Sequence, residues 1–513
     1  PPAHPEAHAP GGGALTRLPL VTLLSALLAA AVLSPVVVLL GMGIGAEAGL
    51  DARVAEVALN SLLLAGLTVI GATLLGVPLA FLTAWTRLPG RGIWTGLLAA
   101  PLAIPSYLGA FAWFAATGPG GEIRMATGIP LPNVDGLAGA TLVMSLYTYP
   151  FVFLATRAAL RNMDASLLEA ARTLGMPLAP ALWRVVLPRV RNSIAAGGLL
   201  VALYTLSDFG TPAIMRVDTF TRVIFVEYNA FGLDRAALLS LALLVLVAVV
   251  LFLESRVRAV RETPGRPPSF ALGRGAQLGA IAGMGAILLA AIGLPVGIFT
   301  LWLVREGAGH FDPAILLNST TASLLAAVAA VAAALPIAFA ATTGRLGRLL
   351  ERVAHVGFGV PGIVLGTALV VVGLNVGFLY QTLALLVFAY VVRFLPLAVG
   401  NIRAPLERAE GSLVGAARSL GASPAEAFRR VTLPLILPGL LAAAALVFLE
   451  AMRELPATLL LRPTGFETLA THLWRVYEAG YFGRGAVPAL LLVVVSGVAV
   501  ALMLRGERRS SQT

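Results

Sequence analysis

Long apolar runs constrain this sequence more than any other feature. Runs of about 18 or more residues recur along the chain, and each is long enough to cross the hydrocarbon core of a bilayer as a helix. Leu18–Ala46 and Ala236–Leu253, for example, contain no charged residue. With 58% hydrophobic and 12% charged residues and a mean hydropathy of +0.90, the 513-residue chain does not have the composition of a soluble globular protein. The pattern predicts an all-α, polytopic membrane protein.

Twelve transmembrane spans are expected from these runs. The first carries no cleavage motif and is longer than the apolar region of a signal peptide, so we expect it to be retained. Residues 1–16, rich in Pro, Ala and Gly, are predicted to be a disordered tail. The spans are expected at approximately 18–44, 58–86, 93–117, 137–158, 191–212, 236–254, 277–304, 317–343, 353–375, 380–400, 435–460 and 486–504.

The placement of arginine predicts the orientation of these spans. All 36 basic residues are Arg, and most lie in short loops between apolar runs. This placement indicates that the net charge of +11 reflects loops beside a membrane and not a nucleic-acid-binding surface. With the N-terminus in the cytoplasm, the inner segments hold 25 Arg and the outer segments nine. Cytoplasmic loops carry the excess of basic residues in membrane proteins. We therefore expect a multi-pass protein of the cell (inner) membrane with both termini cytoplasmic.

Three absences limit the chemistry of the chain. Without Lys it cannot form a Walker A loop, so ATP-driven work would need a separate subunit. Without Cys it has no disulfide, thiolate metal site or Cys nucleophile. The five His residues show no H-E-x-x-H spacing, and no G-x-S-x-G occurs. We expect neither an enzyme nor a bound cofactor.

The sequence is also an internal duplication. Asn60-Ser61 and Gly76–Phe81 recur as Asn318-Ser319 and Ala334–Phe339, each 258 residues further on. Six spans in each half give both copies the same orientation, a parallel repeat with a pseudo-twofold axis along the membrane normal. The predicted domains are a first half at 17–255, a basic, Pro-rich linker at 256–275, a second half at 276–505 and a C-terminal tail at 506–513. The first half is longer, chiefly in an outer loop around Gly118–Gly136.

Two polar loops repeat one pattern. Glu169-Ala170-Ala171-Arg172-Thr173-Leu174-Gly175 is followed nine residues later by Val185-Val186-Leu187-Pro188. Its copy, 246 residues on, is Gly415-Ala416-Ala417-Arg418-Ser419-Leu420-Gly421, followed by Val431-Thr432-Leu433-Pro434.

Local signals predict a helix-turn-helix in each of these loops. Ser166 and Glu169 have the spacing of a capping box, and Ser423-Pro424-Ala425-Glu426 has the same spacing with Pro at the first helical position. Leu167, Ala171 and Leu174 are expected to form one apolar stripe. Gly175 lies where a left-handed residue ends a helix.

The repeated pattern, E-A-A-x3-G-x9-I-x-L-P, resembles the coupling loop of ABC importer permeases. This resemblance implies two tandem type I, MetI-like permease halves with coupling loops at 164–188 and 410–434. It also implies two copies of an ATPase subunit docked at the cytoplasmic face. Because Gly415 replaces the Glu of the motif, the two contacts need not be equally strong. The implied docking residues are Glu169, Ala170, Ala171, Gly175, Pro188, Ala416, Ala417, Gly421 and Pro434.

Five charged residues fall within spans: Asp208, Arg393, Glu450, Arg453 and Glu454. Buried charges in membranes are costly and usually face a cavity or a partner. Asp208 and Glu454 are 246 residues apart, like the coupling loops, and Pro212 and Pro456 follow them as helix breakers. One interpretation places these residues on the translocation pathway, with transient metal contact at the two acids. The alternative is an internal network, such as Arg393 with Glu450 and Arg453 with Glu454.

Three further strings are similar to ferric-iron importer permeases, which fuse two halves in one chain. They are Glu454–Pro463, which reads E-L-P-A-T-L-L-L-R-P, Gly465–Thr471 and Asp208–Ala213. The resemblance implies that a periplasmic ferric-iron-binding protein delivers the substrate. A hard cation prefers oxygen ligands, and the spans offer carboxylates and hydroxyls. Permeases for thiamine, polyamine or sulfate share the architecture, and a secondary transporter is a further alternative that leaves the coupling loops unexplained.

Overall fold

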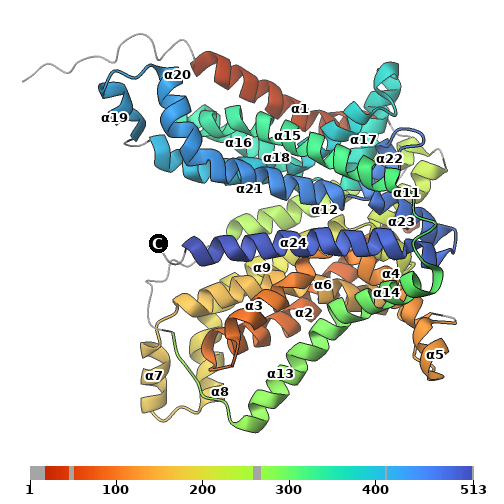
Figure 1. Cartoon of the computed structure of the whole chain (residues 1–513), viewed down its shortest axis with the longest axis vertical. Coiled ribbons are helices and arrows are strands. Elements are labelled where there is room, and N and C mark those ends of the chain that lie inside the picture. Colours follow the sequence, from red (N-terminus) through yellow and green to blue (C-terminus); the bar gives the residue numbers. More distant parts are fainter. Residues whose placement is uncertain are drawn as a thin grey trace, which may run out of the picture. The chain divides into compact units, whose positions relative to one another are not determined.

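The computed structural model describes residues 18–45, 51–118, 120–230, 232–257, 267–410 and 413–510. Over these ranges the chain is helical, without β-strands, and has one isolated bridge between Thr86 and Phe270 (Figure 1). The expected tail at 1–16 lies outside the described residues. So do residues 258–266 of the linker, 411–412 of the second coupling loop and 511–513 of the C-terminal tail.

The helices follow the predicted spans and loops. In the first half they are α1 (Leu18–Gly45), α2 (Ala52–Trp85), α3 (Arg91–Ala99), η1 (Ala100–Ala103), α4 (Ser106–Thr117), α5 (Glu122–Thr127), α6 (Gly136–Asn162), α7 (Ser166–Thr173), α8 (Leu178–Ala181), η2 (Leu182–Val186), α9 (Leu187–Ser207), α10 (Gly210–Ile214), α11 (Phe220–Asn229) and α12 (Leu233–Arg256).

The second half continues from the linker. Its helices are α13 (Arg274–Leu288), η3 (Leu289–Gly293), α14 (Leu294–Glu306), α15 (Pro313–Thr343), α16 (Arg345–Gly359), α17 (Gly362–Asn375), η4 (Gly377–Leu379), α18 (Leu383–Glu410), α19 (Leu413–Ser419), α20 (Pro424–Ala427), η5 (Phe428–Thr432), α21 (Leu433–Met452), α22 (Pro456–Leu461), α23 (Leu469–Glu478), η6 (Phe482–Gly485) and α24 (Ala486–Ser510).

Nine helices of the described chain are long and apolar enough to cross a membrane. The count becomes eleven if two helix pairs, 91–103 with 106–117 and 345–357 with 362–375, each form one span. A shorter apolar helix at Phe482–Val498 occupies the place of the twelfth expected span. The prediction of a polytopic all-α membrane protein is confirmed. The spans expected at 93–117 and 353–375 are not continuous helices, because Pro105 and Pro361 precede α4 and α17 and interrupt the backbone hydrogen-bond ladder.

The helices form two compact units that do not coincide with the sequence halves. Of the described residues, unit 1 contains those up to Val37, those in Ala322–Phe358 and those in Val387–Ala451. Unit 2 contains the described residues of Val38–Thr321 and Gly359–Leu386 and those from Met452 onward. Unit 2 therefore joins nearly all first-half helices to α13, α14, α17, α22, α23 and α24 of the second half.

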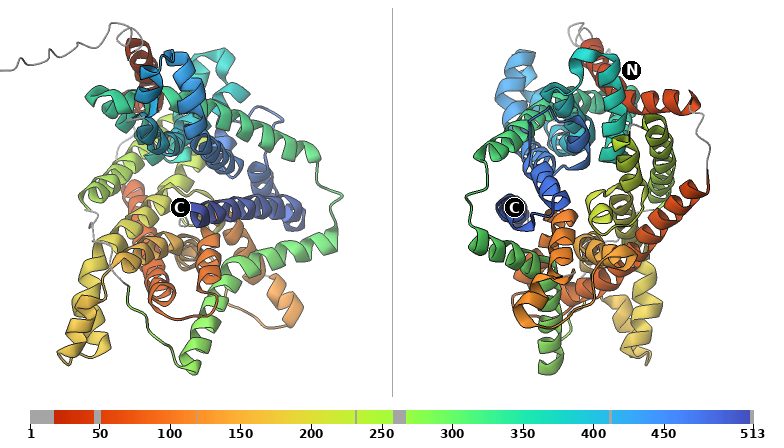
Figure 2. Two further views of the ribbon diagram at one scale, coloured as in Figure 1. Left: turned by 60° about the vertical axis from the view of Figure 1, so that its left-hand side comes forward. Right: turned by 90° about the vertical axis from the view of Figure 1, so that its right-hand side faces the viewer.

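In unit 2 the helices α2, α6 and α9 pack against one another at positions occupied by glycine. A Cβ on Gly76 would lie 2.9 Å from the backbone nitrogen of Phe153, and one on Gly197 would lie 2.7 Å from the Cα of Val152. Small residues permit such close backbone approach between membrane helices. In both views of Figure 2 the yellow α7–α8 segment projects from the rest of this unit.

Three π-helical segments share one cause. η2, η3 and η5 each end immediately before a Leu-Pro pair: Leu187-Pro188, Leu294-Pro295 and Leu433-Pro434. In each pair the Leu N–H bonds to the carbonyl five residues earlier, and the following Pro has no N–H to give the usual ladder bond. Pro188 and Pro434 thus set the same backbone distortion near the end of both predicted coupling loops.

Candidate functional site

The two coupling loops have the same sequence of elements. In unit 2, α7 is followed by Gly175 at φ +83°, then α8, η2 and α9. In unit 1, α19 is followed by Gly421 at φ +91°, then α20, η5 and α21. Both glycines adopt the left-handed conformation that favours glycine. The predicted helix-turn-helix with a glycine turn is therefore present in both described loops (Figure 1).

The exposed surface of these loops includes two equivalent leucines. Leu174 and Leu420, directly before the turn glycines, are each 88% exposed. The expected stripe of Leu167, Ala171 and Leu174 is wrong as a buried face, because Leu168 and Ala171 face inward and Leu167 faces outward. The tertiary partner of α7, which the sequence does not identify, decides which face is buried. Sequence reasoning thus missed the two exposed leucines.

The remaining residues assigned to docking are mostly on the surface. In the first loop Glu169, Ala170, Gly175 and Pro188 are exposed, whereas Ala171 lies on the buried face of α7. In the second loop Ala416, Gly421 and Pro434 are exposed and Ala417 is half-buried. Their role in binding an ATPase stays a prediction.

The capping patterns expected at Ser166, which begins α7, and at Ser423, which precedes α20, have different outcomes. The capping box expected at Ser166 and Glu169 is wrong: Ser166 lies inside the helix, and its N–H donates to Asp164 Oδ1 at 3.1 Å. Asp164 thus satisfies one of the free N–H groups at the start of α7. In the second loop Ser423 does cap α20, accepting from the Glu426 N–H at 3.3 Å, with Pro424 at the first position.

Asp208 and Glu454 lie at breaks of the helical backbone. Asp208 ends α9, and its Oδ2 accepts from the Thr211 N–H at 3.1 Å. Glu454 follows α21, and its two carboxylate oxygens accept from the N–H groups of Ala457 at 3.2 Å and Thr458 at 3.0 Å. Both acids satisfy the N–H groups at the start of a short helix, α10 or α22. The predicted irregular backbone is present, although Pro212 lies within α10 and the break precedes it.

The break between α3 and α4 approaches both of these acidic segments. Ser106 donates to Asp208 Oδ1 at 3.1 Å, and the Arg453 guanidinium donates to the Ala103 carbonyl at 3.0 Å. The Tyr107 hydroxyl donates to the Arg453 carbonyl at 3.3 Å. The two halves of this interrupted span, 91–103 and 106–117, meet at 87°. Unit 2 therefore brings Asp208 and the Arg453-Glu454 pair to one polar region.

Sequence reasoning missed the contribution of this break. The signal available was the pair Pro101 and Pro105 inside an apolar run, since two such prolines disrupt a helix. Arg393 and Glu450 lie in unit 1, where both are half-buried, and the Arg393 guanidinium lies 5.7 Å from the ring centre of Phe394. In the part of the chain that the structure describes, no group of three or more Asp, Glu or His could hold a metal ion.

The repeated Asn-Ser pair has the same contacts in both copies. Ser61 on α2 accepts from the N–H of Phe220, the first residue of α11, at 3.0 Å. Ser319 on α15 accepts from the N–H of Leu469, the first residue of α23, at 2.7 Å. The preceding Asn60 and Asn318 donate to the carbonyls of Asp218 and Glu467. The pair thus attaches α11 to α2 in the first half and α23 to α15 in the second half.

Unit 2 also contains a cavity of about 600 Å³ beside α5, in the insertion around Gly118–Gly136. Its wall includes Phe114, Glu122, Trp302, Glu306, Tyr481 and Arg484. Glu122 accepts from Trp302 Nε1 at 2.7 Å and from Arg305 at 2.6 Å. α5, which contributes Glu122 to the cavity wall, lies at the end of the unit opposite α7 (Figure 1).

Comparisons with known proteins place these features in a family. Residues 72–259 and 322–512 each match the family described as "Binding-protein-dependent transport system inner membrane component". The chain is 33% identical over 468 residues to the Fe(3+)-transport system permease protein FbpB 2 of Haemophilus influenzae, covering 88% of this chain and 90% of that protein. It is 27% identical to the probable ABC transporter permease protein y4fN of Sinorhizobium fredii, covering 89% and 88%.

A shorter match is 30% identical over 188 residues to a probable molybdenum ABC transporter permease protein of Haloferax volcanii, covering 36% of this chain and 69% of that protein. The family match occurs twice, and the two full-length relatives agree with the resemblance noted in the sequence. The chain therefore belongs to the family of binding-protein-dependent transport system inner membrane components, as an ABC importer permease of the inner membrane with both halves fused in one chain.

Proposed function

We propose that this chain is the permease subunit through which an ABC importer moves ferric iron across the inner membrane. The observation that carries the proposal is the duplicated coupling loop, in which helix, left-handed glycine, helix and π segment recur in the same order. A chain with two such loops offers two docking points to two copies of an ATPase subunit. The chain itself has no Lys for a Walker A loop, so the energy comes from those subunits.

The proposed contact surface for each ATPase copy includes an exposed leucine. Leu174 and Leu420 supply apolar area that a partner would remove from water. Glu169 adds a carboxylate at the first loop, whereas Gly415 adds none at the second. We infer that the first contact is the stronger. Equal crosslinking at both loops that is unmoved by Glu169→Ala would refute this asymmetry.

The arginine bias supports cytoplasmic placement of both loops and both termini. The cavity beside α5 then opens on the opposite, periplasmic side, where a binding protein would deliver its cargo. Impermeant labelling of cysteines introduced at Gly175 and Gly421 tests the orientation. Labelling from the periplasmic side would contradict it.

Ferric iron is favoured by two observations of different kinds. The relative that matches nearly the whole chain is named as a ferric-iron permease. The polar region of unit 2 offers carboxylate and hydroxyl oxygens from Asp208, Glu454 and Tyr107, and a hard cation prefers oxygen. We propose that the two acids line the pathway and contact the cation transiently, with Arg453 held nearby by the Ala103 carbonyl. The pathway role expected of Arg393 and Glu450, which lie in unit 1, stays a prediction.

The test is uptake into proteoliposomes that contain the permease with its copurifying ATPase, supplied with the periplasmic binding protein. We expect ATP-dependent accumulation of ferric iron, which is abolished when the ATPase is omitted. Because other relatives are named for molybdenum and sulfate, molybdate and sulfate are tested in parallel, with thiamine and a polyamine. Uptake of one of these solutes without iron would assign another substrate. Uptake driven by an ion gradient alone would indicate a secondary transporter.

A further inference from the structure

The linker between the two halves is hydrogen-bonded to the end of α2. The Phe270 N–H donates to the Trp85 carbonyl at 2.7 Å, and the Arg87 N–H donates to the Phe270 carbonyl at 3.0 Å. Arg87 Nε donates in addition to Ser269 Oγ at 3.1 Å. These contacts form the isolated bridge of Thr86 with Phe270. The linker is thus attached at this point instead of passing freely between the halves.

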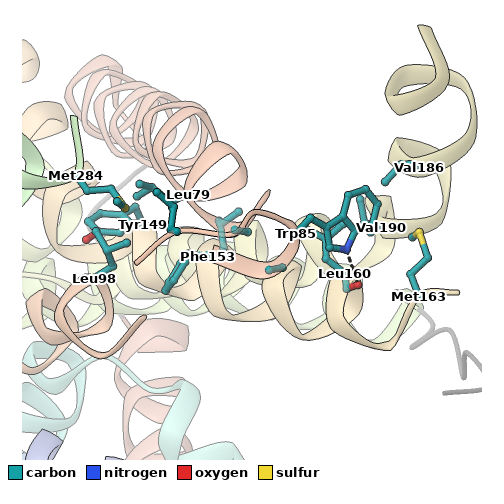
Figure 3. Close-up of a cluster of buried hydrophobic side chains, with 14 of the residues drawn as sticks. Leu79, Trp85, Leu98, Tyr149, Phe153, Leu160, Met163, Val186, Val190 and Met284 are labelled. Atoms are coloured by element: carbon teal, nitrogen blue, oxygen red, sulfur yellow. Dashed lines mark hydrogen bonds between the residues drawn. The ribbon is translucent and has the colours of Figure 1, made fainter. Parts of the chain in front are cut away.

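Trp85, whose backbone carbonyl accepts the hydrogen bond from the linker, is 1% exposed. Its indole N–H donates to the Leu160 carbonyl at the end of α6 at 2.8 Å, and its ring centre lies 6.3 Å from that of Phe270. Figure 3 shows Trp85 beside Leu160, Met163 and Val190 in one buried cluster. Phe270 and Leu272 of the linker pack on the same cluster.

This cluster also supports the first coupling loop. Leu168 and Ala171, the buried side chains of α7, belong to it, together with Ala181 of α8 and Val186 of η2. Linker, α2, α6 and the coupling loop therefore share one packed core. At the position 258 residues after Trp85 the second half has Thr343, which has no indole to make the equivalent contacts.

We propose that Phe270 is a positioning residue for the first coupling loop, so that the linker is a working part of the coupling machinery. A force applied by an ATPase to α7 moves the membrane helices only if the contacts behind α7 are rigid. Packed cores and hydrogen-bonded segments transmit displacement in this way. The bridge at Phe270 closes this core on the linker side. The inference rests on the proposed coupling function, and its test separates the two.

The test compares two proline variants that differ by one residue. Phe270→Pro removes the N–H that bonds to Trp85 and the ring that packs on it. Ala271→Pro is the matched control: Ala271 is exposed and outside the bridge, and a following proline favours the extended conformation that Phe270 already has. Phe270→Leu keeps the N–H and apolar bulk and serves as the conservative rescue. All are made in the full chain.

The first readout is amide hydrogen exchange of the purified permease, which needs no partner. We expect exchange in α7 to become about fivefold to tenfold faster in Phe270→Pro, the effect of losing roughly one hydrogen bond. Exchange in α19 of Phe270→Pro is expected to match the wild type. Exchange in α7 of Ala271→Pro and of Phe270→Leu is also expected to match the wild type. Unchanged α7 exchange in Phe270→Pro would overturn the proposal. Equal acceleration in α7 and α19 would show general unfolding and would also overturn it.

The second readout is crosslinking from Leu174→Cys and Leu420→Cys to the copurifying ATPase. In the Phe270→Pro background we expect the Leu174→Cys yield to fall at least twofold and the Leu420→Cys yield to be unchanged, with less iron transported per ATP hydrolysed. If Leu420→Cys crosslinks and both yields are unchanged, the positioning role of Phe270 is refuted. If neither cysteine crosslinks to the ATPase when Phe270 is unchanged, the proposed coupling function is refuted.

Discussion

An amide in place of the Asp208 carboxylate separates the charge of this residue from its hydrogen bonds. Asp208 accepts from the Thr211 N–H at 3.1 Å and from Ser106 Oγ at 3.1 Å. In Asp208→Asn the amide oxygen can keep the first bond, and the amide N–H can donate to the serine oxygen. Asn and Asp are equally good at a helix start, so we expect a stability change below about 1 kcal/mol.

Alanine at the same position removes both hydrogen bonds. Loss of the cap costs about 1 kcal/mol, and leaving the hydroxyl of Ser106 without its partner adds about 1–3 kcal/mol, since Ser106 is buried. We therefore expect Asp208→Ala to lower the yield of folded complex, and Asp208→Asn to leave it near the wild-type level. Size-exclusion chromatography of the assembled complex measures this difference.

Iron uptake per folded permease then reports on the charge alone. If Asp208 lines the pathway, Asp208→Asn should lower ATP-dependent uptake at least tenfold while basal ATP hydrolysis persists. Wild-type uptake by Asp208→Asn would refute the pathway role and leave Asp208 as a helix cap. A normal yield of folded Asp208→Ala would show that the hydrogen-bond reasoning is wrong. Glu454→Gln should be less well tolerated, because a single amide oxygen replaces two that accept from separate N–H groups.

Three further predictions concern the turns, the Asn-Ser pair and pH. Nothing lies within 4 Å of a Cβ built on Gly175 or Gly421, so a Val at either position should impair transport through backbone strain alone. Asn tolerates the left-handed conformation better, so it should reduce transport less than Val does. Equal loss of uptake from Val and Asn would contradict this. Ser61→Ala and Ser319→Ala each leave a buried N–H without its acceptor, at a cost of about 1–3 kcal/mol, so hydrogen exchange should rise in α11 and α23 respectively. The pKa of Glu467 is lowered from 4.5, first by its hydrogen bond to His472, so its stabilising effect should be present at neutral pH and lost as the pH falls through that lowered pKa. The protection of residues 466–472 relative to intrinsic exchange, measured against pH, should show this loss, and Glu467→Gln should remove the pH dependence of that protection.

Much of the architecture could be predicted from the sequence, because in a bilayer each apolar run satisfies its own backbone hydrogen bonds as a helix. The helical spans, the duplication and both coupling loops, with glycine at the turn, depend on residues close together in the chain. The left-handed conformation of Gly175 and Gly421 follows from the same local rule. The family could be inferred because its motif lies within such a local segment.

Other features were decided by tertiary contacts. Leu168 rather than Leu167 is buried, because the core behind α7 is built from α2, α6 and the linker. The polar region around Asp208 depends on Ser106 and Ala103, about 100 residues away in the sequence, and on Arg453 from the second half. The contact between Phe270 and Trp85 has no local signal in either segment. Periodicity and capping patterns describe one helix at a time, whereas these contacts depend on which helix faces come together when separate spans pack.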